Sequence, residues 1–218
     1  MSNRFKSRYD DDINLFEGRW HLAQYALLIV LLLAAPWLLG VYYLGELTAV
    51  LIWSLAGLGL MLISGHTGQV SLGHAAFMAI GAFTNLALMM RGWHFIPALL
   101  ASAVTSGVLG AIISRPILRM SGIYLAIATL ALSIIIEDVS IIAEPITGGV
   151  AGLFAPPIDM FGLKIDRYTS PAAFYYLCLT VLVIVTLGYL NLLRSASGRS
   201  FLAVRDSEVS ARALGVNV

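Results

Sequence analysis

The sequence predicts an all-α integral membrane protein, a polytopic helical bundle with about six spans in this chain. Of its 218 residues, 59% are hydrophobic and 11% are charged, and the mean hydropathy is +0.88. A soluble domain carries about twice that charged fraction. The apolar residues also form long stretches of about 20 residues, enough to cross the hydrocarbon core as helices, separated by short polar breaks.

These stretches define the elements in chain order. Residues 1–20 are charged and form a predicted cytosolic tail. The predicted spans are His21 to Leu44, kinked near Pro36; Leu47 to Ile63, after a break at Gly45 and Glu46; a third crossing that ends near Met90; Pro97 to Ser114; Ile123 to about Ile136; and Pro171 to Leu193. The longest connection is the outer loop 137–170, rich in Gly and Pro, and a connection of this length usually has a function.

The distribution of cations predicts the orientation, because Lys and Arg concentrate in cytoplasmic loops. With a cytosolic N-terminus, ten cations fall on the inner side and three on the outer side. The inner ones are Arg4, Lys6, Arg8, Arg19, Arg115, Arg119, Arg194, Arg199, Arg205 and Arg212, and the outer ones are Arg91, Lys164 and Arg167. The domains are therefore a tail 1–20, a transmembrane bundle 21–193 and a cytosolic segment 194–218.

The stretch SGHTGQVSLGHAAFMAIG, residues 64–81, is polar and glycine-rich although it joins two apolar runs. Such groups are costly in hydrocarbon unless protein or water satisfies them, so they should face the bundle interior or a cavity. We interpret the stretch as the wall of a polar translocation path, with Gln69, Ser71 and His74 as its candidate residues. The alternative is a packing seam of small residues. Residues 65–90 form either a full span or a re-entrant segment.

The predicted spans carry no Asp, Glu, Lys or Arg near their centres. Ion-coupled carriers generally need such groups or broken-helix ion sites, so the energy for any transport should come from a partner. Intramembrane catalysis is disfavoured, because there is no HExxH motif and no pair of intramembrane acids. The single cysteine, Cys178, gives no metal framework, and no basic cluster indicates nucleic acid. We expect no metal site, no bound cofactor and no enzymatic activity in this chain.

Residues 194–218 are helix-prone but too polar to span a membrane. Asp206 or Ser207 is a suitable cap for a second short helix with Glu208 in its first turn, so the segment should fold as two short helices. Three apolar residues recur at helical spacing as a narrow stripe, with Arg205 and Arg212 beside it; they are Leu202, Val209 and Ala213. The alternative is a surface helix that leads into another span.

Four ordered segments resemble the permease subunits of ABC importers for branched-chain amino acids, specifically the LivM-like subfamily. They are GHTGQVSLGHAAFMAIGAF at 65–83, SGIYLAIATLAL at 121–132, TGGVAGL at 147–153 and RSASGRSFLAVRDSEVSARALGVN at 194–217. The resemblance implies a multi-pass subunit of the bacterial plasma (inner) membrane that moves branched-chain amino acids inward by alternating access. It further implies that residues 194–218 are the cytosolic coupling loop, with Arg205, Glu208, Arg212 and Gly215 as its candidate coupling residues.

The resemblance also implies partners. ATP should bind to separate ATP-binding cassette subunits, and a second related permease subunit should complete the membrane part. A periplasmic or extracellular substrate-binding protein should dock on the outer loop 137–170, and membrane lipid should surround the spans. Ala151 stands where the family's outer motif is commonly polar, and relatives continue with further spans after the coupling loop, so we expect an incomplete subunit. A passive channel or secondary carrier for small polar solutes such as urea or amides is the alternative function.

Overall fold

The structure is a computed structural model that describes residues 19–117, 120, 122–160 and 163–216. It is helical apart from one short antiparallel hairpin, in which Ile158 pairs with Ile165. The elements are α2 (Arg19–Leu38), α3 (Val41–Leu60), the π-helical turn η1 (Met61–His66), α4 (His74–Met90), α5 (Phe95–Ile117), α6 (Ile123–Ile142), α7 (Glu144–Thr147), η2 (Gly149–Ala151), β1 (Ile158–Met160), β2 (Leu163–Ile165), α8 (Pro171–Arg194), α9 (Ala196–Asp206) and α10 (Glu208–Ala213).

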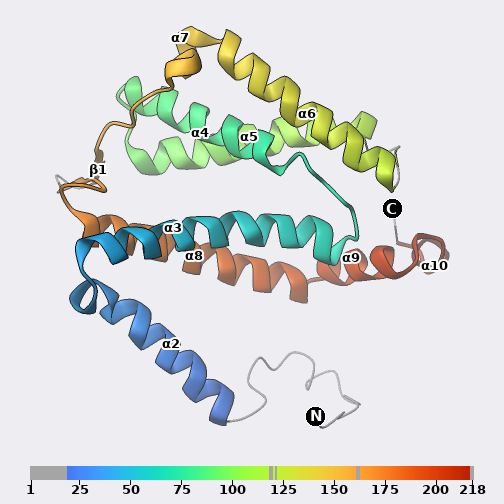
Figure 1. The fold of residues 1–218 in the computed structure, drawn as a ribbon. Coiled ribbons are helices and arrows are strands. Elements are labelled where there is room, and N and C mark those ends of the chain that lie inside the picture. Colours follow the sequence, from blue (N-terminus) through green and yellow to red (C-terminus); the bar gives the residue numbers. More distant parts are fainter. Residues whose placement is uncertain (1–18, 118–119, 121, 161–162, 217–218) are drawn as a thin grey trace.

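Six apolar helices run back and forth between two ends of the molecule (Figure 1). Four are long and apolar enough to cross a membrane: α3 with η1, α5, α6 and α8. Two shorter apolar helices, within α2 and α4, add to these. The prediction of a polytopic helical membrane protein is confirmed, whereas the division at residues 20 and 193 stays a prediction. The predicted tail lies outside the described residues, except for Arg19 and Trp20 at the start of α2.

The helices form two groups. In one, α3 lies along α8, and α2 contributes Ala35 to their shared apolar core, which also contains Leu44, Leu51, Tyr175 and Leu179. In the other, α4 lies along α5 and α6. An apolar cavity of about 240 Å³ lies between the groups, lined by residues of α3, α5, β1 and α8. Most large apolar side chains on the helix surfaces are exposed, as expected of helices that face lipid or further protein.

The first two helices are separated at Gly40, and the predicted break at Gly45 and Glu46 is wrong. Pro36 has no N–H, so the carbonyl oxygen of Leu32 lacks its helical donor, and α2 ends two residues after the proline. The hydroxyl of Tyr175, which is fully buried, donates to this oxygen at 2.8 Å. Glu46 instead lies in the second turn of α3, where its carboxylate is exposed.

Two other predicted boundaries also move. Helix α5 continues through Arg115 and Pro116 to Ile117, and α6 continues through Glu137 and Asp138 to Ile142. Both carboxylates are exposed, so they do not oppose the continuation of the helix. The outer connection between spans is therefore residues 143–170 instead of 137–170. Arg119 lies outside the described residues.

The two ends of the bundle carry different structures (Figure 1). At one end, α9 and α10 follow α8 and lie beside the end of α3. At the opposite end lie α7, η2 and the β1–β2 hairpin. The cations divide in the same way: Arg115 and Arg194 lie in the last turns of helices at the α9–α10 end, whereas Arg91 and Arg167 lie in turns and Lys164 lies in β2 at the other end.

Candidate functional site

Residues 67–73 form a non-helical segment that reaches the middle of the bundle. The amide of Leu72 donates to Thr129 Oγ1 at 2.9 Å, and Ser133 Oγ donates to the Leu72 carbonyl oxygen at 3.1 Å. Thr129 and Ser133 lie near the middle of α6, which runs from Ile123 to Ile142. Non-helical backbone is tolerated at this depth only where protein or a water-filled cavity satisfies it, and α6 supplies that satisfaction.

The segment and α4 together make one broken crossing. Figure 1 shows the chain leaving the end of α3, turning back between the helices, and continuing as α4 to the opposite end. Helix α4 has 17 residues, and at 1.5 Å per residue it is about 26 Å long, shorter than a hydrocarbon core of about 30 Å. The non-helical residues 67–73 supply the remaining length. Of the two interpretations of residues 65–90, this path favours a full span over a re-entrant segment.

The three predicted path residues lie on or directly after the broken segment. Gln69 and Ser71 are half-buried in it, and His74 is the first residue of α4. The His74 ring lies against Gly59 of α3, where a Cβ atom would stand 2.8 Å from the ring. The structure therefore brings these three residues to one region between α3, α4 and α6. Whether substrate passes there stays a prediction.

Small residues allow the close packing around this region. A Cβ atom at Gly73 would lie 3.1 Å from the carbonyl oxygen of Thr129, and one at Gly81 would lie 3.1 Å from Ser106 Oγ. Ala76 is also buried, with 3% of its surface exposed. The packing seam therefore coexists with the polar segment, and the two interpretations of residues 64–81 are not exclusive.

The carboxyl-terminal segment folds as the two capped helices that the sequence predicts. Ser195 caps α9 by accepting from the Gly198 amide, and Ser207 caps α10 by accepting from the Ser210 amide, each at 3.3 Å. Glu208 and Arg212 form an ion pair along one face of α10. Of the predicted apolar stripe, Leu202, Val209 and Ala213 are all exposed, so the stripe faces away from the bundle.

Gly215 ends α10 in a Schellman motif. Its φ is +85°, its amide donates to the Arg212 carbonyl, and the Val216 amide donates to the Ala211 carbonyl, both at 3.0 Å. A residue with a Cβ is strained at this φ, so glycine has a structural reason to occupy position 215. Among the predicted coupling residues, Arg205 lies apart from Glu208 and Arg212: it is on α9 and contacts the segment that follows α3.

Gly198 permits the contact between α9 and the end of α8. A Cβ atom at this position would lie 2.3 Å from the Leu193 carbonyl oxygen and 2.5 Å from that of Leu192. Both are backbone atoms that cannot move aside without displacing the helix. A glycine is therefore required to hold the α9–α10 pair against the bundle.

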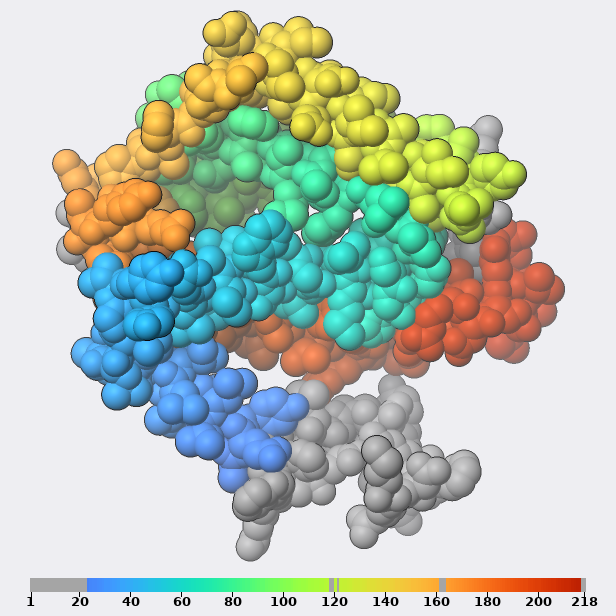
Figure 2. Space-filling model, in the orientation of Figure 1, coloured from blue at the N-terminus to red at the C-terminus, as the bar shows by residue number. Residues whose placement is uncertain are grey.

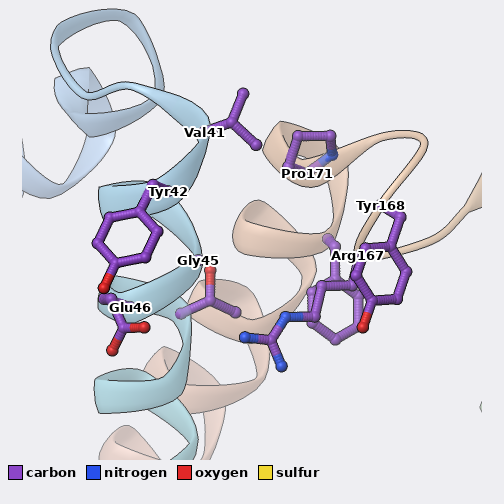
Figure 3. A pocket seen from close by; sticks show the side chains of 9 residues that line it. Val41, Tyr42, Gly45, Glu46, Arg167, Tyr168 and Pro171 are labelled. Atoms are coloured by element: carbon purple, nitrogen blue, oxygen red, sulfur yellow. The ribbon is translucent and has the colours of Figure 1, made fainter.

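The opposite end has a shallow cavity of about 210 Å³ between the N-terminal ends of α3 and α8 (Figure 3). Tyr42 and Glu46 border it on α3, and Arg167 and Tyr168 border it on the loop before α8. Figure 3 shows the guanidinium group of Arg167 directed toward Gly45. Large apolar side chains are also exposed at this end: Val150 by 89%, Phe154 by 95% and Tyr168 by 85%.

Sequence reasoning did not assign the residues that hold the broken segment. Thr129 and Ser133 bind the backbone of Leu72, and Tyr189 of α8 contacts His66, with its hydroxyl 3.2 Å from His66 Nδ1. A signal was present: two hydroxyls four residues apart lie on one face of the apolar part of α6 that precedes Glu137. No such sequence pattern predicted the contact of Tyr189, because its partner His66 is 123 residues away in the sequence.

Comparison with known proteins gives a consistent picture. Residues 42–218 match the family described as the permease component of the branched-chain amino acid transport system. Two curated relatives are high-affinity branched-chain amino acid transport system permease proteins LivM. The chain is 32% identical to that of Salmonella typhimurium and 31% identical to that of Escherichia coli, in each case over 87% of this chain and 50% of the relative. The chain thus spans about half the length of these relatives. No solved structure matches the chain significantly.

Proposed function

The chain belongs to the family of branched-chain amino acid permease components, and from this premise we propose that it is the membrane-spanning part of an ATP-driven amino acid importer that works by alternating access. The α9–α10 pair is the observation that carries the proposal. It is a capped, polar helix pair at one end of an apolar bundle, held to α8 by Gly198 and exposing an ion pair and an apolar stripe. Such a surface suits docking of a soluble partner.

In this proposal the α9–α10 pair is the cytosolic coupling loop, and its partner is an ATP-binding cassette subunit that binds the ATP. Glu208 and Arg212 present their charges to that subunit: their side chains are 53% and 63% exposed, respectively, and bond only to each other among the described contacts. Gly215 fixes the end of α10. The cytosolic position of this end agrees with the concentration of Arg residues there, as does a cytosolic N-terminus in the bacterial plasma membrane.

The substrate path in this proposal follows the broken segment. Gln69, Ser71 and His74 offer polar groups at mid-depth, next to the hydroxyls of α6 that bind the broken segment. A helix that begins inside the membrane, as α4 does, directs its N-terminal amides toward the path. These amides favour binding of the carboxylate of an amino acid. Branched-chain amino acids are the proposed substrates, because the curated relatives are named for their transport.

Two further partners belong to the proposal. The exposed Val150, Phe154 and Tyr168 and the cavity of Figure 3 suit the docking of an extracytoplasmic substrate-binding protein at the end opposite α9–α10. The exposed apolar faces of the helices suit a second permease subunit, with lipid on the remaining surface.

The test is ATP-dependent uptake with Glu208→Leu in the complete transporter, reconstituted in vesicles. The variant removes the ion pair and places an apolar side chain at the docking face. We expect it to lose uptake by at least about tenfold, within the usual range of coupling between sites, while the amount of protein in the membrane stays unchanged. Binding of the ATPase subunit should fall in parallel. The matched control Glu46→Leu changes an exposed carboxylate at the opposite end and should leave ATPase-subunit binding intact.

The same vesicles separate the importer from a passive channel or secondary carrier. Wild-type uptake should require internal ATP and the ATPase subunit. Uptake that persists without either would replace the importer by the passive alternative. Normal ATPase binding and normal uptake in Glu208→Leu would remove α10 from the coupling role.

A further inference from the structure

We infer that Arg205 is a positioning residue that joins the α9–α10 pair to the broken crossing, so that movement of the pair is passed directly to residues 65–73. The inference rests on the proposed function and deepens it, because it assigns Arg205 to a contact inside this chain instead of to the ATPase surface. The juxtaposition joins residues 140 positions apart in the sequence.

Arg205 makes two contacts with the segment that follows α3. Its Nη1 donates to the carbonyl oxygen of Gly65 at 3.0 Å, and its side-chain carbons cover Gly68. At Gly68 the φ is +69°, and a Cβ atom would lie 2.8 Å from Arg205 Cγ. The backbone there turns in a conformation that favours glycine, and the missing side chain leaves the space that the arginine stem occupies.

Asp206, the next residue in the chain, orients the guanidinium group of Arg205. Asp206 Oδ1 accepts from both Nε and Nη2 of Arg205, at 3.2 and 3.1 Å, which leaves Nη1 for Gly65. Because the planar guanidinium group is rigid, fixing two of its nitrogens sets the direction of the third. Figure 2 shows the carboxyl-terminal helices, in red, adjoining the end of α3 and the segment after it, in teal.

Other helices hold residues next to the two glycines that Arg205 contacts. His66 lies edge-on to the ring of Tyr189 on α8, and Leu72 bonds to Thr129 and Ser133 on α6. Between these points the chain has no helix of its own, so a displacement at Gly65 and Gly68 is passed along seven non-helical residues to His74. Arg205 therefore joins the coupling pair to the proposed path without passing through a complete span.

The first test measures substrate taken up per ATP hydrolysed in the reconstituted transporter. Arg205→Ala should lower this ratio by about fivefold or more while ATPase-subunit binding is retained, because the Arg205 side chain bonds within this chain. Arg205→Lys, which keeps a cationic donor, should restore part of the ratio. Ser200→Ala on the same helix, where the hydroxyl donates to the Ala196 carbonyl and to no other group in the described part of the chain, should leave both readouts unchanged.

The second test replaces this hydrogen bond by a covalent bond. A Cβ atom at Gly68 would lie 3.5 Å from Arg205 Cβ, which matches the Cβ separation of about 3.5–4.5 Å in disulfides. In a background with Cys178→Ala, the pair Gly68→Cys and Arg205→Cys should crosslink under mild oxidation. The oxidised pair should recover the uptake-to-ATP ratio, and reduction should lower it again. Any strain that the cysteine causes at position 68 is present in both the oxidised and the reduced protein. It therefore does not affect the difference between their uptake-to-ATP ratios.

Three results would overturn the inference. They are a failure of the cysteine pair to crosslink in the folded transporter, an unchanged ratio in Arg205→Ala, and a loss of ATPase binding in Arg205→Ala equal to its loss of uptake. None of these is the failure of the proposed function, which would appear as ATP-independent uptake by the wild-type transporter. The crosslink itself is scored on the protein alone, without transport.

Discussion

The two ends of the bundle differ in how they are built. At the α9–α10 end, both helices start with a serine cap, α10 ends in a Schellman motif, and Arg205 bonds to the carbonyl oxygen of Gly65. At the other end, α7, η2 and the hairpin are short, and their connection leaves Val150 and Phe154 almost fully exposed. The α9–α10 end is joined to the segment after α3 by a side-chain hydrogen bond, whereas the connections at the other end leave these two large apolar side chains uncovered.

In the proposed importer, this difference assigns force transmission to the α9–α10 end and partner selection to the opposite end. A capped unit that bonds to the broken crossing would pass displacement inward, as coupling requires. Exposed aromatic and aliphatic side chains contribute binding free energy when a partner covers them, without any need to move the bundle. Substitutions at the two ends should therefore affect different kinetic parameters, and the following three are ordered by expected effect.

The largest effect is expected from Gly198→Ala. The new Cβ atom would lie 2.3 Å from the Leu193 carbonyl oxygen, so α9 must move away from α8. Overpacking of this kind costs about 1–3 kcal/mol, and here it displaces the whole coupling unit. We expect uptake to fall by more than about tenfold and α9–α10 to become sensitive to protease in inside-out vesicles.

Gly188→Ala is the matched control, because position 188 lies on α8 near the same end and a Cβ atom there would meet nothing within 4 Å. Uptake should stay at the wild-type level, and the helix should gain up to about 1 kcal/mol of stability. Equal losses in the two variants would contradict the assignment of Gly198 as the residue that holds the pair to α8.

A smaller effect, in a different parameter, is expected from Phe154→Ser at the opposite end. Phe154 is 95% exposed and would supply an aromatic contact to a substrate-binding protein. Losing it should raise the apparent KM for the loaded binding protein by about tenfold, as expected of about 1–2 kcal/mol, with maximal uptake unchanged. Phe154→Tyr keeps the ring and should behave as wild type. A fall in maximal uptake at unchanged KM would assign a transmitting role to this end as well.

The smallest effect is expected from Ser207→Ala. The variant removes the cap of a six-residue helix, and such a cap is worth about 1 kcal/mol. Hydrogen exchange of α10 amides should accelerate by about fivefold, while α9 stays protected by its own cap at Ser195. If both helices exchange faster together, the pair is one cooperative unit and Ser207 stabilises all of it.

The sequence predicted those features that local chemistry determines. The start of α8 at Pro171 and the two-helix tail were predicted correctly, and of the two candidate caps Asp206 and Ser207 the structure has Ser207, because proline and serine mark helix starts by themselves. The break between the first two helices was misplaced, because Gly45 and Glu46 are polar or small yet tolerated inside α3. A glycine in a helix costs only about 1 kcal/mol, which packing of α3 along α8 offsets.

The sequence predicted only part of the candidate site. The polarity of residues 64–81 indicated a segment that protein or water must satisfy inside the membrane, and the broken segment 67–73 lies within it. Their partners could not be found in this way: Thr129 and Ser133 are 57 and 61 residues from Leu72, and Arg205 is 140 residues from Gly65. Long-range pairs depend on how the helices pack, and local periodicity carries no information about that.

The bond between Tyr175 and Leu32 has a consequence for biogenesis. Pro36 leaves the Leu32 carbonyl without a helical donor from the moment the first helix is made, and the phenol that satisfies it is synthesised 143 residues later. Until then the Leu32 carbonyl oxygen has no hydrogen-bond donor in an apolar environment, which costs several kcal/mol. Helix α2 therefore reaches its final position only when α8, which carries Tyr175, has been made and has packed against it.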